Sequence, residues 1–252
     1  MKTKAMTAVA ILLLSLMTAA FTCSATGSLT AVDIIERMDN AVKRLNDLTA
    51  VLTIQTYKDG AVSLTQKMRI MLQQPDKMRL EYLAPAYLAG NVTLIVGDKM
   101  WMYIAAMNKW FNKDLSKMSP AEQPWLMFRN VLRGVRSELD DYTFTRLADE
   151  GNAYHIRGRP ANDAAVYGRI DLWVDPKTFV PIRRTLYDRD GALLVDARFL
   201  DATQVADGVT LPLRIETYNS DGKLVNVIAY DKVTVNAGIS AALFTPPEGS
   251  DG

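Results

Sequence analysis

The sequence predicts a mainly β protein built from antiparallel strands. Many short segments alternate apolar and polar side chains, which is the pattern of a strand with one buried face. The alternation is clearest in residues 78–82, where Met, Leu and Tyr alternate with Arg and Glu. Short turns rich in Asp, Asn and Gly separate these segments. Short connections favour strands that are neighbours both in the sequence and in an antiparallel sheet.

The composition is that of a globular protein with a sizeable core. Apolar residues make up 49% of the 252 residues, and 29 basic side chains nearly balance 28 acidic ones. The resulting net charge of +1 gives no electrostatic basis for binding nucleic acid. Because no linker-like segment interrupts residues 26–252, we expect them to form a single domain.

The first 25 residues have the pattern of a secretory signal peptide. Lys2 and Lys4 precede an uncharged apolar run at residues 8–21, and small residues follow it. This run is shorter than the roughly 20 apolar residues of a comfortable membrane span, although a single N-terminal anchor helix is the alternative. We expect export to the periplasm. No later run is apolar enough to span a membrane.

The signal peptide has three candidate ends: cleavage after Ala20, cleavage at Cys23, and cleavage after Ala25. Cys23 is the only cysteine, so an intramolecular disulfide is excluded. It lies where a bacterial lipoprotein signal places its lipidated cysteine, but the preceding Phe21 and Thr22 fit that processing poorly. Both interpretations stay open: a lipidated Cys23 that anchors the protein to a membrane, or a cysteine without a role that can leave with the signal.

Local patterns predict one N-terminal helix followed by strands. Apolar residues recur at helical spacing through residues 30–48, and Thr30 or Asp33 can cap the helix. Asp59-Gly60 predicts a tight hairpin. Ser119-Pro120 begins a helical insertion at residues 119–135. The predicted strands are 50–57, 62–72, 78–82, 91–96, 100–104, 109–111, 142–147, 153–159, 168–174, 180–188, 193–201, 211–219 and 223–235.

The sequence contains no recognisable catalytic or metal-binding motif. His155 is the only histidine; it lies in the middle of a predicted strand without a nucleophile motif, and we expect it at the surface or rim. Most acidic residues lie in turns, as Asp175 does, although composition alone does not exclude a two-carboxylate glycosidase. Asp140-Asp141 is better explained as an element boundary than as a calcium site. We therefore expect no enzyme activity, no cofactor and no metal.

Methionine and aromatic residues crowd the first half of the chain. Methionine is flexible and is over-used on promiscuous apolar binding surfaces, although an ordinary core is the simpler interpretation. The methionines are Met68, Met71, Met78, Met100, Met102, Met107, Met118 and Met127.

Several segments together resemble the periplasmic outer-membrane lipoprotein carrier (LolA-like) family, in its branch of outer-membrane lipoprotein-sorting proteins. The resemblance covers nearly all of the chain after the signal. Its motifs are the segments 74–82, 97–103, 172–178, 180–182, 187–191 and 243–247, in that order and spacing.

The resemblance implies a curved antiparallel sheet that forms an incomplete, unclosed β-barrel with covering helices. It also implies a non-enzymatic periplasmic protein that holds lipid acyl chains or lipoprotein cargo between sheet and helices. Such a protein takes its cargo from an inner-membrane donor and passes it to an outer-membrane acceptor. The alternative is an amphiphile-sensing regulatory protein of the same fold that acts on a membrane-bound partner. In the best-known carriers an arginine before the turn proline latches the lid, and Gln74 occupies that position here.

Candidate cargo residues follow from alternation together with the resemblance. Alternation places Leu80 with Tyr82, and Met100 with Met102, on single faces of their strands. The resemblance assigns that face to acyl chains, which gain about 0.8 kcal/mol for each buried CH₂ group. The lid candidate is the segment 119–135, and its expected cargo-facing residues are Trp125, Leu126 and Phe128.

Overall fold

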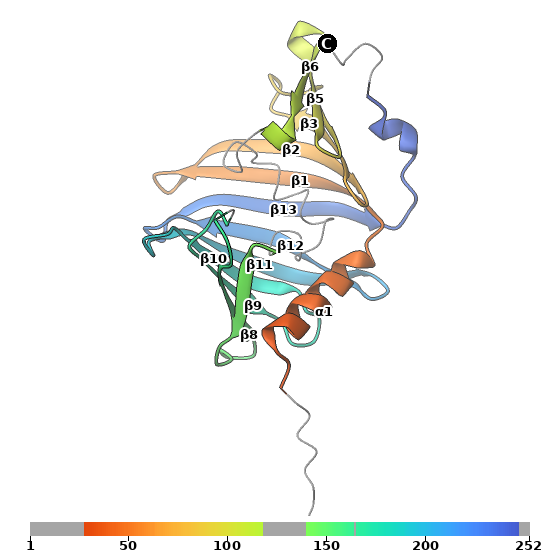
Figure 1. Cartoon of the computed structure of the whole chain (residues 1–252). Helices are drawn as coiled ribbons and strands as arrows, with labels where there is room; N and C mark the ends of the chain where they lie inside the picture. Colours follow the sequence, from red (N-terminus) through yellow and green to blue (C-terminus); the bar gives the residue numbers. More distant parts are fainter. Residues whose placement is uncertain (1–27, 118–139, 164, 247–252) are drawn as a thin grey trace, which may run out of the picture.

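The computed structural model describes residues 28–117, 140–163 and 165–246. Within these residues, thirteen antiparallel strands form one curved sheet that is not closed (Figure 1). This confirms the predicted mainly β fold with an incomplete barrel. The predicted signal peptide, Cys23 and the segment 119–135 with Trp125, Leu126 and Phe128 lie outside the described residues.

The strands run from one edge of the sheet to the other in the order β6-β5-β4-β3-β2-β1-β13-β12-β11-β10-β9-β8-β7. The first and last strands of the chain are therefore paired in the middle of the sheet, and β6 and β7 are its edges. The elements are α1 (Ala31–Lys43), β1 (Asp47–Lys58), β2 (Ala61–Gln73), β3 (Lys77–Ala84), β4 (Val92–Val96), β5 (Lys99–Ile104), η1 (Ala105–Met107), β6 (Lys109–Asp114), η2 (Leu115–Lys117), β7 (Tyr142–Arg146), β8 (Tyr154–Pro160), β9 (Arg169–Val174), β10 (Pro181–Tyr187), β11 (Leu193–Ala206), β12 (Val209–Tyr218), β13 (Leu224–Val235) and η4 (Ala241–Phe244).

Helix α1 begins where the sequence predicts and ends earlier. The hydroxyl of Thr30 accepts a hydrogen bond from the Asp33 N–H at 3.2 Å, and the Asp33 carboxylate accepts one from the Thr30 N–H at 2.7 Å. This reciprocal pair is a capping box. The predicted end at Leu48 is wrong, because the helix stops at Lys43 and Leu48 pairs with Leu72 and Val235 in the sheet. A buried apolar residue at position 48 satisfies helical and strand periodicity alike, so the pattern alone cannot separate them.

One hairpin was predicted correctly and another was missed. Asp59 and Gly60 both have positive φ, at 53° and 80°, as a two-residue hairpin turn requires. The predicted gap between residues 201 and 211 is wrong. Strand β11 continues through Asp201, which has a φ of 55°, and β12 starts at Val209. Asp201 interrupts the alternation of apolar and polar residues. Because of this break, the sequence pattern does not indicate that the strand continues to a turn at Asp207 and Gly208.

The sheet has an inner face, against which α1 packs, and an outer face. One core cluster on the inner face centres on β1–β3, and it includes Leu52, Ile70 and Leu80. A second cluster joins Ile34 and Met38 of α1 to Ile156 and Leu172 of β8 and β9. A small third cluster on the outer face contains Met71, Leu94, Trp101 and Phe244. Helix α1 thus covers only part of the inner face.

Arginines and aromatic rings stack on the outer face of β8–β12. Arg183 lies over the Trp173 ring at 4.7 Å, Arg169 lies over Tyr187 at 3.4 Å, and Arg198 lies over Tyr218 at 4.4 Å. Buried carboxylates pair with these guanidinium groups, as at Arg183 and Asp196, where Nε lies 2.8 Å from Oδ1. This part of the outer face is therefore polar, and most of the apolar burial in the second half of the sheet lies on the inner face.

Candidate lipid-binding site

An apolar cavity of about 350 Å³ lies between α1 and the inner face of the sheet. This volume falls in the range of about 300–1,000 Å³ that is usual for small-molecule sites. Most of the wall comes from the second half of the sheet, and the end of α1 closes one side. The lining residues are Met38, Ala41, Val42, Leu45, Leu48, Leu72, Leu172, Phe179, Val180, Pro181, Arg184, Leu186, Val195, Ala197, Phe199, Val209, Thr210, Leu211, Pro212, Ile215, Thr217 and Tyr230.

Few polar groups interrupt this lining. Arg184 is the one residue with a formal charge among the described residues of the wall, and Thr210, Thr217 and Tyr230 contribute hydroxyl groups. Burial raises the pKa of the Tyr230 phenol to about 12, so this side chain is neutral at physiological pH. A mainly apolar wall with a few placed polar groups is the usual composition of a ligand pocket.

The carboxyl end of α1 is tied to the sheet beside the cavity. The Gln74 amide donates to the carbonyl oxygens of Val42 and Leu45, at 3.2 Å and 2.6 Å. The Asn236 amide donates to the Arg44 carbonyl oxygen at 2.9 Å. Helix ends leave carbonyl groups unsatisfied, and these amides supply donors. Gln74, at the position where the resemblance implies a latching arginine, thus holds the end of α1 through hydrogen bonds.

We expect Gln74→Leu to lower the free energy of unfolding by about 1–3 kcal/mol, because the part-buried Leu45 carbonyl group loses its side-chain donor and the Val42 carbonyl group keeps only its backbone donors. Chemical denaturation measures this loss, and hydrogen exchange should show faster opening of the last turn of α1. Gln204→Leu is the matched control, because Gln204 is exposed on β11. Equal stability of the two variants would contradict the anchoring role.

The four cargo residues predicted in the early strands lie together but away from this cavity. Leu80 and Met100 are each 1% exposed, and Tyr82 and Met102 pack against the same inner-face cluster. The shared face that alternation predicts is therefore present. None of the four is among the residues that line the cavity. Their role in lipid binding stays a prediction.

Sequence reasoning missed the residues that do line the cavity. They come from α1, β1, β2 and β9–β13, and only the tertiary fold brings them together. One local signal was available. Arg184 shares its sheet face with apolar Leu186 and Leu172, and a charge on an apolar face marks a position of interest.

His155 is buried, which makes the prediction of a surface or rim position wrong. Its side chain stacks on Trp173 with ring centroids 4.4 Å apart, and its Nδ1 lies 3.0 Å from a Glu150 carboxylate oxygen. The other Glu150 oxygen accepts a hydrogen bond from the Trp173 indole at 2.9 Å. The turn before β8 folds Glu150 over this pair. These contacts describe a packed polar cluster.

The acidic residues singled out by the sequence have structural explanations. Asp141 immediately precedes β7 and accepts a hydrogen bond from the Asn162 amide at 3.0 Å, which confirms the predicted boundary. The Asp175 carboxylate accepts hydrogen bonds from the backbone N–H groups of Lys177 and Thr178, which is the expected turn chemistry. Within residues 28–117, 140–163 and 165–246, no three His, Cys, Asp or Glu side chains gather as a metal site would require.

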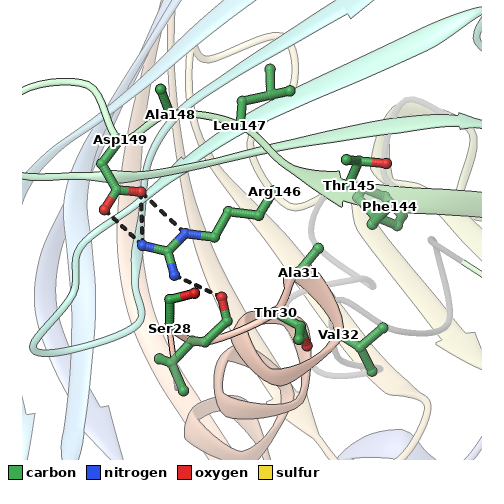
Figure 2. Close-up of a pocket in the computed structure, with 11 residues that line it drawn as sticks. Ser28, Thr30, Ala31, Val32, Phe144, Thr145, Arg146, Leu147, Ala148 and Asp149 are labelled. Carbon is green, nitrogen blue, oxygen red and sulfur yellow. Dashed lines mark hydrogen bonds and ion pairs between the residues drawn. The ribbon is translucent and has the colours of Figure 1, made fainter. Parts of the chain in front are cut away.

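A second, more open hollow lies where the chain enters α1, and Figure 2 shows its lining. Arg146 of β7 crosses this hollow. Its guanidinium group pairs with the Asp149 carboxylate at 2.7 Å and donates to the Leu29 carbonyl oxygen at 2.6 Å. These contacts fasten the start of α1 to the edge of the sheet. The hollow is best explained as part of that junction.

Comparison with known proteins gives the family. A protein-family model with the description "-like: Uncharacterized protein" matches residues 74–248. The chain belongs to this family. Its fold is the LolA-like fold of outer-membrane lipoprotein-sorting proteins, as the sequence resemblance predicted. No curated protein matches the chain. In the part of the chain that the structure describes, no helix is long and apolar enough to cross a membrane.

Three solved structures share the fold over most of the chain. A DUF1329 family protein from Desulfovibrio piger is 19% identical, with a TM-score of 0.69, and the alignment covers 84% of this chain and 95% of that one. An outer membrane lipoprotein-sorting protein domain from Vibrio parahaemolyticus is 18% identical, with a TM-score of 0.64 and coverage of 84% and 95%. A LolA superfamily protein from Nitrosomonas europaea is 18% identical, with a TM-score of 0.63 and coverage of 87% and 99%.

Proposed function

We propose that this protein is an exported, non-catalytic carrier that holds an acyl chain of a lipoprotein or phospholipid and serves its transfer towards the outer membrane. The observation that carries the proposal is the apolar cavity between α1 and the inner face of the sheet. The LolA-like fold supports it, because one relative with this fold is an outer membrane lipoprotein-sorting protein domain.

The energetics suit a carrier. Each CH₂ group of an acyl chain gains about 0.8 kcal/mol on burial, so a chain can be held without directional bonds. The lysines and apolar run at the start of the sequence support export to the periplasm, with Cys23 as a candidate lipid anchor. A donor in the inner membrane and an acceptor in the outer membrane complete the proposed route. In this proposal, residues 26–252 form the single domain of the protein that binds the lipid.

Native mass spectrometry of the protein purified from its own cell envelope tests the proposal. We expect a bound lipid, and a protein that starts at Phe21, Cys23 or Thr26. A mass increased by lipid on Cys23 would establish the anchor. A protein that retains its first 20 residues, or one that carries no lipid and binds no added fatty acid, would overturn the proposal.

Filling the cavity from α1 should remove lipid binding without unfolding the protein. Ala41 lines the cavity, and the neighbouring Asn40 is exposed and is not among the lining residues. We expect Ala41→Phe to weaken binding of a fluorescent fatty acid about tenfold or more, since tenfold corresponds to fewer than two buried CH₂ groups. Asn40→Phe should bind like the parent. If Ala41→Phe keeps the parent affinity, the acyl chain lies elsewhere.

A further inference from the structure

Tyr230 lies where the cavity meets the core of the early strands. It stands on β13 opposite Leu52 of β1, and its side chain packs against the inner-face cluster that includes Leu52 and Leu80. The same side chain lines the cavity, together with Leu48 near the start of β1. One side of Tyr230 is therefore held by the core, and the other side borders the cavity.

The hydroxyl group of Tyr230 makes no hydrogen bond with the residues that the structure describes. Other phenols on the sheet are paired. The Tyr142 oxygen accepts a hydrogen bond from the Tyr167 N–H at 2.7 Å, and the Tyr218 hydroxyl donates to the Glu216 carboxylate at 2.7 Å. A group the size of water can still reach the Tyr230 oxygen, so the hydroxyl faces the cavity.

This position suits an uncharged hydrogen-bond acceptor on a ligand. A hydroxyl group without a partner in apolar surroundings costs free energy, which a bound acceptor recovers. Burial raises the pKa of the Tyr230 phenol to about 12, so the group keeps its proton and can donate it. The neighbouring wall from β9–β12 is mainly apolar, with Leu172, Leu186, Phe199 and Ile215. A ligand that matches both features carries one neutral acceptor on a hydrocarbon chain.

Building on the proposed carrier function, we propose that Tyr230 makes the cavity selective for esterified acyl chains. Its hydroxyl donates a hydrogen bond to the ester carbonyl oxygen, and the hydrocarbon lies along Phe199 and Ile215. An ester carbonyl carries no charge and accepts a hydrogen bond well, whereas an ether-linked alkyl chain has no carbonyl to offer. A site built around a hydrogen bond discriminates against a ligand that lacks it, because the polar group of the site is then left unpaired.

The test compares an ester with its matching ether. Monolauroylglycerol and dodecylglycerol share the head group and the chain length, and they differ only at the carbonyl. Their binding is measured by calorimetry, below the concentrations at which they form micelles, for the delipidated parent, Tyr230→Phe and Tyr142→Phe. We expect the parent to bind the ester about three- to tenfold more tightly than the ether. Tyr230→Phe should bind the two alike, and Tyr142→Phe, which loses a hydroxyl outside the cavity, should keep the parent's preference.

Stability without ligand separates a recognition role from a structural one. Tyr230→Phe should unfold at the same denaturant concentration as the parent or a higher one, because its hydroxyl has no partner to lose among the described residues. Tyr142→Phe should unfold at a lower concentration, because the Tyr167 N–H loses its acceptor. A clear loss of stability in Tyr230→Phe would assign its hydroxyl a structural role and overturn the ester site.

The binding outcomes separate this inference from the proposed function. Equal binding of ester and ether by the parent overturns the ester selectivity and leaves the acyl carrier standing. An ester preference that persists in Tyr230→Phe overturns the role of this hydroxyl. No binding of either ligand by the parent overturns both the inference and the proposed function.

Discussion

Gly168→Ala is expected to destabilise the protein by about 3 kcal/mol or more, because the added methyl group meets backbone that cannot move aside. Gly168 lies directly before β9, and its N–H donates to the Tyr187 carbonyl oxygen at 3.0 Å. A Cβ atom here would lie 2.6 Å from the Arg189 Cα and 2.7 Å from the Asp188 carbonyl carbon, and closer still to the Asp188 oxygen. Relief requires separation of β9 from the end of β10. Chemical denaturation, together with soluble yield, measures the loss.

Gly222→Ala provides the control for this prediction. Gly222 has a φ of 72° and open space around its Cα, so the substitution meets a conformational penalty without a collision. A left-handed backbone conformation costs an alanine about 1–2 kcal/mol. We therefore expect the Gly222 variant to be clearly more stable than the Gly168 variant. The reverse order would show that the β9–β10 junction is looser than the structure indicates.

Asp171→Ala is expected to have the next largest effect. The Asp171 side chain is 2% exposed on the outer face, and its two oxygens accept hydrogen bonds from Arg157 at 2.7 Å and 2.8 Å. Arg169 lies 3.5 Å from the same carboxylate. Removal of the carboxylate leaves two guanidinium groups facing each other without their shared acceptor. Both arginines are 28% exposed, so water recovers part of the loss, and we expect a decrease of about 2–4 kcal/mol in the free energy of unfolding.

The comparison for Asp171 is an acidic residue in a turn. Asp190 is exposed between β10 and β11, and Asp190→Ala should change stability by no more than about 0.5 kcal/mol. Raising the salt concentration should only slightly narrow the difference in the free energy of unfolding between the Asp171 and Asp190 variants. Salt screens a buried ion pair less than an exposed one. If the two variants unfold at the same denaturant concentration, the ion pairs of Asp171 with Arg157 and Arg169 contribute nothing measurable to the stability of the protein.

Local signals predicted most of the fold. The Thr30 cap, the Asp59-Gly60 turn and the alternation at residues 78–82 are each decided by neighbours in the sequence, and each lies where it was predicted. Errors occurred where two local patterns compete. Leu48 fits a helix or a strand, and pairing with the distant Val235 decides for the strand. Asp201 interrupts an alternation that pairing with β12 maintains on both sides of it.

The candidate site was less accessible to sequence reasoning than the fold. The cavity exists because α1 ends where Gln74 can hold it, and because β9–β13 curve beneath it. Neither fact is encoded in the pattern of any single segment. His155 illustrates the same limit, because its burial depends on Trp173 of the next strand and on Glu150 of the preceding turn. An alternation pattern indicates which residues share a face, but not where that face is left uncovered.

The pairing of β1 with β13 in the middle of the sheet governs the order in which the chain can fold. Strand β1 can form its hairpin with β2 as soon as both are synthesised, but its other edge must wait for residues 224–235. Joining segments so distant in sequence costs chain entropy before the contacts between them can contribute any favourable energy. This delay slows folding. Until then the other edge of β1 exposes unpaired backbone groups, and exposed edges invite association with other chains. Completion of the last strand is therefore the step that turns two separate meanders into one cooperative sheet.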